Sequence, residues 1–291
     1  VPKFHGLMHA CRGPRRHRRP AKRNYTVSDL RALKGSGRTL SMANPANSDE
    51  VRACVEAGID LLTVWPDQLK DVRDIAPYHF TGVGASWAQF GSDDELIAHA
   101  YEMMRNGADM YYTVRSFDVM ERMARDGIPV QSHIGLIPTF SHYSGGLRAW
   151  GRTAEEAMKV YATLKRMEDV GVFAVEVECL AEEVLAAVND KTNMVTFSLG
   201  SGKAADAVIC FIADICGEAS EEDNPPKHAH AFGNVGRLHR QINLERVEAL
   251  GKFHTEVTAH NFPYPQNNVR MHDGEQEKFL EALDKWQPAH I

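Results

Sequence analysis

The sequence predicts an α/β protein of the (β/α)8 TIM barrel class, with an additional C-terminal helix and a basic N-terminal arm. From residue 38 onward, short apolar segments alternate with amphipathic helical segments, which is typical of parallel strands joined by helices. About eight such units fit a closed barrel better than an open sheet. We therefore expect an arm (1–37), a barrel (38–216), and a long connection with a C-terminal helix and tail (217–291) that packs on the barrel or a neighbouring subunit.

The expected strands are short and are mostly separated by helical patterns. They cover residues 39–43, 59–65, 81–86, 108–114, 129–138, 173–178, 194–200 and 207–213. The stretch 129–138 matters most, because an apolar strand runs there into His133 and then into a loop that contains glycines.

The helices between the strands are identified by their end signals. Ser48 is the expected N-cap of the first helix, acids follow Ser92 in the first turn of another, and Thr153 caps a long helix that closes at Gly171. Two more helices are expected at 116–126 and 181–188. After a connection over 217–242, the last helix covers 243–258, with a stripe formed by Leu244, Val247, Leu250 and Phe253.

Composition excludes several classes of protein. The net charge of −6 argues against a nucleic-acid-binding body, although residues 1–23 carry eight Lys or Arg residues and no acid. No apolar run is long enough to span a membrane. The five cysteines form no metal-type pair, which favours free thiols in a reducing compartment, so we expect a cytoplasmic protein.

His133 is the first candidate functional residue. Strand side chains alternate, so His133 and Gln131 share one face, and a titratable residue at the C-terminal end of a parallel strand lies where α/β barrels carry their active sites. A histidine bonded to a neighbouring carbonyl is an equally good interpretation.

Glu178 ends the next expected strand, 173–178, in a similar way. Glu176 lies two residues earlier on the same face, and two carboxylates facing one way are costly to bury unless they are paired or functional. At the barrel mouth Glu178 could remove a proton next to a carbonyl. A glutamate bonded to a loop amide or an arginine is an equally good interpretation.

Other signals are weaker. Asp67 follows a strand end and could bind a metal or substrate, or simply cap a helix. The run 199–203 lacks the spacing of a nucleotide-binding P-loop, but its backbone near Ser201 could bind a carboxylate or phosphate. The pair His228 and His230 has no clear third metal ligand.

The run His133-Ile-Gly-Leu-Ile-Pro138, followed by Gly145-Gly146 and Gly151-Arg152, resembles the ketopantoate (3-methyl-2-oxobutanoate) hydroxymethyltransferase family. Segments 104–110, 128–130, 177–179 and 200–202 follow in the family's order and spacing, so the resemblance covers roughly residues 38–262. It implies a barrel of the phosphoenolpyruvate mutase and isocitrate lyase superfamily, assembled into homo-oligomers. It also implies a metal-bound enolate of a 2-oxo acid and a one-carbon unit from methylene-tetrahydrofolate.

By this resemblance, Glu178 corresponds to the family's general base and His133 to its substrate-side histidine. The metal site departs from the family. The first metal aspartate falls within Val64-Trp65-Pro66-Asp67, so Asp67 is the only remaining candidate ligand, and the second falls at Gly84 or Ala85. The substrate lysine falls at Tyr112. Mg²⁺ needs hard oxygen ligands, so the resemblance implies a divergent member that has lost most of its metal site.

The sequence thus predicts an enzyme that makes or breaks a carbon–carbon bond next to a carbonyl, by aldol or retro-aldol transfer of a hydroxymethyl unit on a 2-oxo acid or related substrate. Glu178 and His133 are the expected catalytic residues. The expected substrate-binding residues are Asp67, Tyr112, Ser41, Ser201 and Trp65. One alternative is a metal-free lyase of the superfamily acting on a different, aromatic substrate. The other is a non-catalytic barrel that binds a small acid or a protein.

Overall fold

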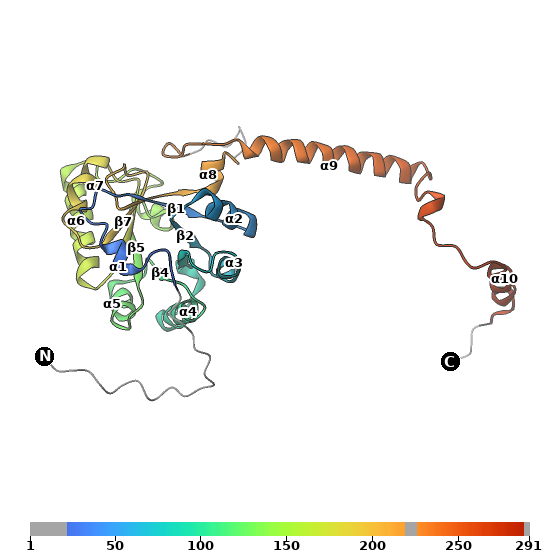
Figure 1. The fold of residues 1–291 in the computed structure, drawn as a ribbon, viewed down its shortest axis with the longest axis horizontal. Coiled ribbons are helices and arrows are strands. Elements are labelled where there is room, and N and C mark those ends of the chain that lie inside the picture. Colours follow the sequence, from blue (N-terminus) through green and yellow to red (C-terminus); the bar gives the residue numbers. More distant parts are fainter. Residues whose placement is uncertain (1–21, 219–225, 288–291) are drawn as a thin grey trace, which may run out of the picture. The chain divides into compact units, whose positions relative to one another are not determined.

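The computed structural model describes residues 22–218 and 226–287, which belong to two compact units, Val1–Asn234 and Val235–Ile291. In the first unit, eight parallel strands close into a barrel in chain order (Figure 1). They are β1 (Leu40–Asn44), β2 (Leu61–Val64), β3 (Phe80–Gly84), β4 (Met110–Tyr112), β5 (Val130–Gly135), β6 (Ala174–Glu178), β7 (Val195–Leu199) and β8 (Ala207–Phe211). The predicted (β/α)8 class is confirmed.

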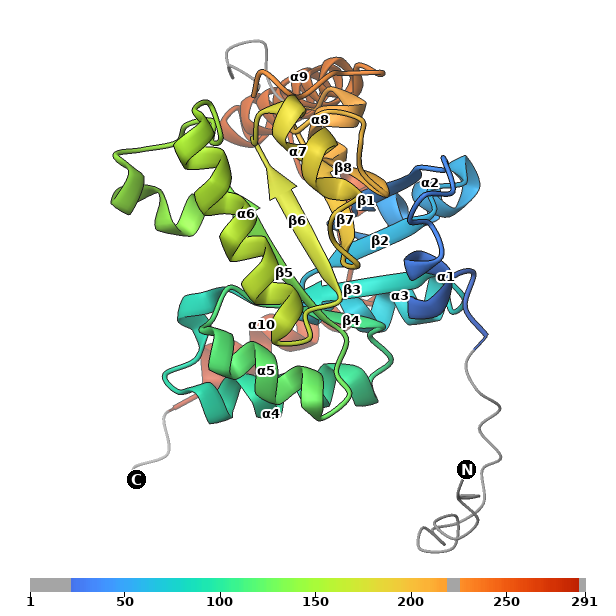
Figure 2. The ribbon, with the colours of Figure 1, turned by 90° about the vertical axis from the view of Figure 1, so that its left-hand side faces the viewer.

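Helices connect all consecutive strands except β7 and β8. They are α2 (Ser48–Ala57), α3 (Leu69–Ile75), α4 (Asp93–Arg105), α5 (Phe117–Arg125), α6 (Ala154–Asp169) and α7 (Glu182–Asn189), and the short α8 (Ile212–Cys216) follows β8. Short 3-10 turns add η1 (Pro66–Gln68), η2 (Trp87–Gln89) and η3 (Pro138–Ser144). Helix α4 packs against β4, and α5 and α6 pack against β5 on the outside of the barrel (Figure 2).

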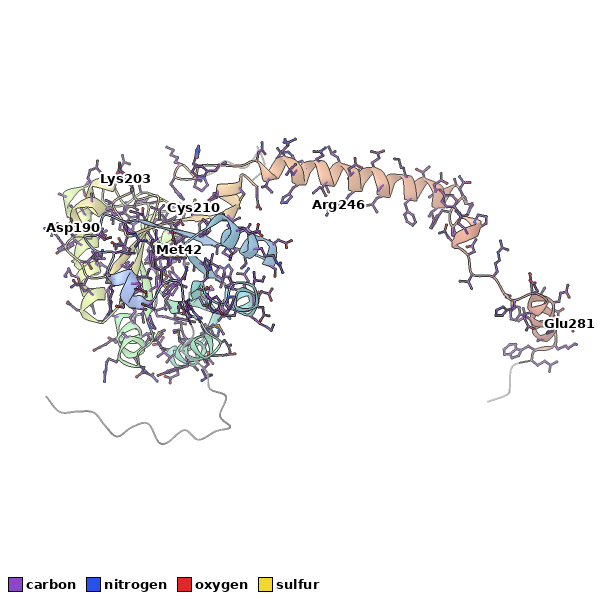
Figure 3. All side chains as sticks on the ribbon, viewed as in Figure 1. Met42, Asp190, Lys203, Cys210, Arg246 and Glu281 are labelled. Carbon is purple, nitrogen blue, oxygen red and sulfur yellow. The ribbon has the colours of Figure 1, made fainter. Side chains whose placement is uncertain are left out.

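The core has two layers, as strand alternation requires. Side chains such as Met42, Phe80 and Phe197 fill the inside of the barrel, and Met42 is labelled in Figure 3. The intervening residues, such as Tyr111, pack between strands and helices with residues such as Leu164. The inner layer is apolar at the N-terminal ends of the strands, so the polar inward positions collect at the C-terminal ends.

Local signals explain most of the helix ends. Thr153 accepts a hydrogen bond from a first-turn amide, which confirms the predicted cap, and Ser92 and Ser116 cap their helices in the same way. The first cap was predicted one residue too late: Asn47, not Ser48, accepts from the amides of Asp49 and Glu50. Both residue types are good caps, so sequence alone did not distinguish them.

The N-terminal segment is only partly described. Residues 1–21, which carry most of the basic charge, lie outside the described residues. Residues 22–37 belong to the barrel unit and include α1 (Val27–Arg31). Leu30 and Leu33 are buried with the first residues of several strands, and Arg23 Nε donates to Asp109 Oδ1 at 2.8 Å. These residues therefore cover the N-terminal end of the barrel.

The second unit contains α9 (Val235–Thr258), η4 (Pro265–Asn267) and α10 (Glu275–Lys285). Helix α9 begins eight residues before the predicted start at 243, so part of the expected connection is helical. Side chains project from α9 on all sides (Figure 3). Within the described residues, no helix has both the length and the apolar character needed to cross a bilayer.

Candidate active site

A cavity of about 360 Å³ opens at the C-terminal ends of the barrel strands. Its polar lining includes Tyr112 of β4, His133 of β5, and Glu176 and Glu178 of β6. Its apolar lining includes Trp65, Val114, Ile209 and Phe211. The cavity therefore combines one polar cluster with walls suited to an apolar group.

Side chains alternate between the two faces of a strand, and this alternation along the paired strands β5 and β6 places His133 next to the two glutamates. In the parallel register His133 pairs with Glu176, and Gly135 pairs with Glu178. His133 Nε2 lies 3.2 Å from Glu178 Oε2. One ligand atom from each of the three residues lies within 4.8 Å of the other two. These residues form a compact group that could hold a metal ion or move protons.

Tyr112 fixes the other nitrogen of the histidine. Its hydroxyl lies 2.9 Å from His133 Nδ1, and the two rings meet edge to face. His133 is only 3% exposed. The tyrosine therefore holds the imidazole so that Nε2 faces the two glutamates.

The same burial shifts the ionisation of the cluster. Burial raises the pKa of Glu176, and the nearby charge of Glu178 adds to this rise while His133 opposes it. Burial alone would lower the pKa of His133, but the carboxylates of Glu176 and Glu178 outweigh it, so the pKa is raised. Burial and the same two carboxylates also raise the pKa of Tyr112 well above its usual value, so the phenol stays protonated.

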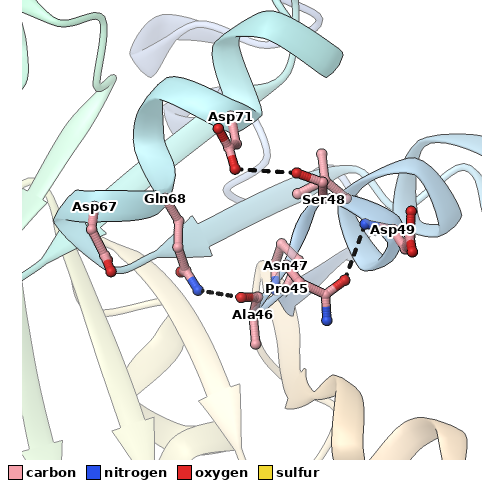
Figure 4. A pocket seen from close by; sticks show the side chains of 9 residues that line it. Pro45, Ala46, Asn47, Ser48, Asp49, Asp67, Gln68 and Asp71 are labelled. Carbon is pink, nitrogen blue, oxygen red and sulfur yellow. Dashed lines mark hydrogen bonds between the residues drawn. The ribbon is translucent and has the colours of Figure 1, made fainter. Parts of the chain in front are cut away.

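The predicted site residues do not all meet in this cavity. His133, Glu178, Tyr112 and Trp65 line it. Asp67 instead lines a separate pocket with Asp49 and Asp71, where Gln68 Nε2 donates to the Ala46 carbonyl (Figure 4). The structure therefore does not bring Asp67 together with His133 and Glu178.

Ser41 and Ser201 have structural partners. The Ser41 hydroxyl donates to Asp60 Oδ2 at 2.9 Å. In β1, Ser41 lies between Leu40 and Met42, which both face the inside of the barrel. The buried Ser201 hydroxyl donates to the Val177 carbonyl at 2.8 Å and accepts from the Leu180 amide. Neither residue lines the cavity that contains His133. Ser201 instead fixes the turn that follows Glu178.

Glu176 is the main site residue to which the sequence assigned no role. The period of two along β6 showed that it shares a face with Glu178. Its contact with His133 depends on the register between β5 and β6, which the sequence does not reveal.

Comparison with known proteins identifies the family. The family model described as ketopantoate hydroxymethyltransferase matches residues 87–265. This chain belongs to that family. A 3-methyl-2-oxobutanoate hydroxymethyltransferase from Cenarchaeum symbiosum (strain A) is 30% identical over 184 residues, covering 62% of this chain and 67% of the relative. An enzyme of the same name from Ignicoccus hospitalis is 26% identical and covers 83% of this chain and 97% of the relative.

Two solved structures show a partial similarity to this chain. The crystal structure of 2,3-dimethylmalate lyase, described as a member of the PEP mutase/isocitrate lyase superfamily, is 12% identical, with a TM-score of 0.48 over 90% of this chain and 96% of that chain. The carboxyl transferase domain of Rhizobium etli pyruvate carboxylase is also 12% identical, with a TM-score of 0.48 over 65% of this chain and 42% of that chain. The fold assignment rests on the closed eight-stranded sheet.

The Mg²⁺ site implied by the family resemblance does not fit the residues present. At the corresponding positions, Val64 and Trp65 have no side-chain oxygen, and Asp67 lines another pocket. Gly84 also lacks a ligand: a Cβ there would lie 3.2 Å from Cβ and 3.1 Å from Cδ1 of Tyr112. Tyr112 thus occupies the space that a larger residue at Gly84 would need. We derive no catalytic step through an ion at these positions.

Proposed function

We propose that this ketopantoate hydroxymethyltransferase family member transfers a hydroxymethyl unit to or from the carbon next to a carbonyl, by aldol or retro-aldol chemistry. The observation that carries the proposal is the contact between Glu178 and His133 in a cavity at the C-terminal ends of the strands. Family membership provides the reaction class, and the cavity provides the residues.

In the aldol direction, Glu178 accepts the proton from the carbon next to the carbonyl. The electron pair of that C–H bond then forms the new bond to the carbon of formaldehyde, whose oxygen takes a proton and becomes the hydroxyl group. The carbonyl oxygen binds beside Glu178, within reach of His133 Nε2, which stabilises the negative charge that develops on that oxygen. Tyr112 positions His133 through the 2.9 Å contact with Nδ1.

The relatives' name makes 3-methyl-2-oxobutanoate the first substrate to test. The apolar wall at Ile209 and Phe211 suits its branched carbon chain. The same wall and Trp65, which is 52% exposed, favour an aromatic carbonyl compound as the second candidate. Mg²⁺ as the resident ion receives no support from the residues present, and tetrahydrofolate as the one-carbon donor stays a prediction.

The test is a formaldehyde assay on the protein as purified, with and without added Mg²⁺. The forward reaction uses 3-methyl-2-oxobutanoate and the reverse reaction uses ketopantoate. Because Glu178 is the base, Glu178→Gln should lower kcat by about 10²–10⁴-fold. Glu183→Gln, which changes an exposed glutamate on α7, is the matched control.

Two outcomes would contradict the proposal. Equal rates in the wild type and Glu178→Gln would remove Glu178 as the base. Absence of turnover with both compounds would exclude them as substrates, and aromatic carbonyl compounds would be tested next.

We infer that the protein is a homo-oligomer in the cytoplasm that acts on a small carbonyl compound. The exposed apolar side chains of α9 support self-association. Cys54, Cys179, Cys210 and Cys216 are free thiols, which agrees with a reducing compartment.

A further inference from the structure

We propose that His133, Glu176 and Glu178 form a binding site for a divalent first-row transition-metal ion such as Zn²⁺ or Mn²⁺. This inference goes beyond the proposed reaction, because it concerns ion binding and holds whether or not the protein turns over a particular substrate. It also differs from the family-type site, whose positions lie on other strands of the barrel.

The spacing of the three residues fits a single ion. Two ligand atoms about 2.0–2.2 Å from one ion, at tetrahedral or octahedral angles, lie about 3–3.5 Å apart. His133 Nε2 and Glu178 Oε2 are 3.2 Å apart, and the complete set of three lies within 4.8 Å. A small change in the rotamer of Glu176 would bring its carboxylate to binding distance of an ion held by His133 and Glu178.

The histidine nitrogen lacks a hydrogen bond. His133 Nε2 is buried and has no hydrogen-bond partner, although Glu178 lies at ion-pair distance. An unsatisfied polar atom in a protein interior costs free energy. An ion between the three residues would satisfy this nitrogen directly.

Neighbouring side chains hydrogen-bond to both the imidazole ligand and a carboxylate ligand. A histidine that binds metal through Nε2 normally donates its other N–H to an outer partner. The Tyr112 hydroxyl is placed to accept from Nδ1 at 2.9 Å. Gln131 Nε2 donates to Glu176 Oε2 at 3.3 Å, which orients the carboxylate. The cluster therefore already has the outer contacts that metal ligands require.

The ligand types select the kind of ion. One imidazole nitrogen and two carboxylates suit Zn²⁺ or Mn²⁺, whereas Mg²⁺ prefers oxygen ligands alone. The two carboxylates also balance the charge of a divalent ion. Glu176 and Glu178 line the cavity, so remaining coordination positions would open toward a bound carbonyl oxygen. A carboxylate has two oxygens, so Glu178 can bind the ion through one and accept a proton with the other.

The test measures ion binding by calorimetry on the metal-stripped full chain without substrate. We expect Zn²⁺ and Mn²⁺ to bind at this site far more tightly than Mg²⁺. Glu176→Gln and Glu178→Gln should each weaken that binding by at least about 100-fold, because each removes a charged ligand. Circular dichroism of the two near-isosteric variants checks that they fold.

Two controls separate this site from other candidate ligands. Asp67→Asn changes the acidic pocket of Figure 4, and His228→Gln with His230→Gln removes the His-x-His pair. Both controls should keep the Zn²⁺ site that Glu176→Gln loses. Equal Zn²⁺ affinity and stoichiometry in the wild type and Glu176→Gln would overturn the inference, and so would loss of the ion in Asp67→Asn. Because no substrate is present, failure here is distinct from failure of the formaldehyde assay.

Discussion

Tyr112 and Gly84 lie on neighbouring strands and share one space inside the barrel. They are register partners between β3 and β4. A Cβ at Gly84 would meet Tyr112 Cβ at 3.2 Å, and that atom is fixed by the backbone and cannot rotate away. The absence of a side chain at Gly84 therefore makes room for the Tyr112 side chain.

This complementarity predicts the effect of Gly84→Ala. The substitution should destabilise the protein by about 1–2 kcal/mol, because crowding against Tyr112 outweighs the gain from replacing glycine in a strand. In a Tyr112→Gly background, which removes the Cβ as well as the ring, the same change should be neutral or slightly stabilising. Urea unfolding of the four proteins measures the coupling. Equal costs in both backgrounds would show that the two residues do not compete for space.

The sequence predicted which individual residues belong to the site better than it predicted the contacts between them. His133 and Glu178 could be chosen because each is a titratable residue near the end of a strand. The Tyr112–His133 contact could not be predicted, because it depends on how β4 and β5 pair and on two rotamers. Asp67 also follows a strand, but it lies in a 3-10 turn that lines another pocket.

The paired strands β5 and β6 carry the group formed by His133, Glu176 and Glu178. Beyond His133, β5 passes so close to β6 that a Cβ on Gly135 would lie 2.2 Å from the Glu178 carbonyl oxygen. Leu136 N donates to the same oxygen at 2.8 Å. Gly135 also has φ of +85°, a region that favours glycine. The close approach holds Glu178 beside His133.

Gly135→Ala should therefore destabilise the protein by about 3 kcal/mol or more, since a backbone clash adds to the left-handed φ cost. Gly127→Ala is the matched control, with φ of +86° and open space around the new methyl group, so about 1–2 kcal/mol is expected. Chemical denaturation gives both values. If the two substitutions cost the same, the contact with Glu178 is not what requires glycine.

Most strands were predicted to within a few residues because a period of two and an apolar composition mark them clearly. Helix starts were less certain where two good cap residues are adjacent, as at Asn47 and Ser48. The early start of α9 was missed because Gly236 and His239 have weak helix propensity. In a helix as long as α9, the favourable residues outweigh the weak helix propensity of a few positions.

For the whole molecule, strand–helix alternation was sufficient to predict the closed barrel, because few other folds accommodate eight such units. The role of the second unit could not be derived in the same way. Its apolar side chains Leu238, Ile242, Val247, Leu250 and Phe253 are between 47% and 66% exposed along α9. Exposed apolar surface of this extent is typical of an interaction surface.

We predict that α9 contributes to self-association of the chain. Light scattering after size exclusion should show an oligomer for the wild type and smaller species for Ile242→Glu with Leu250→Glu, because buried charges oppose an apolar interface. Gln241→Glu with Thr255→Glu adds two acids at exposed polar positions of the same helix and should leave the mass unchanged. A wild-type monomer would contradict the prediction. Equal loss of mass in both double variants would instead attribute the effect to charge alone, so the comparison isolates the apolar side chains as the cause of assembly.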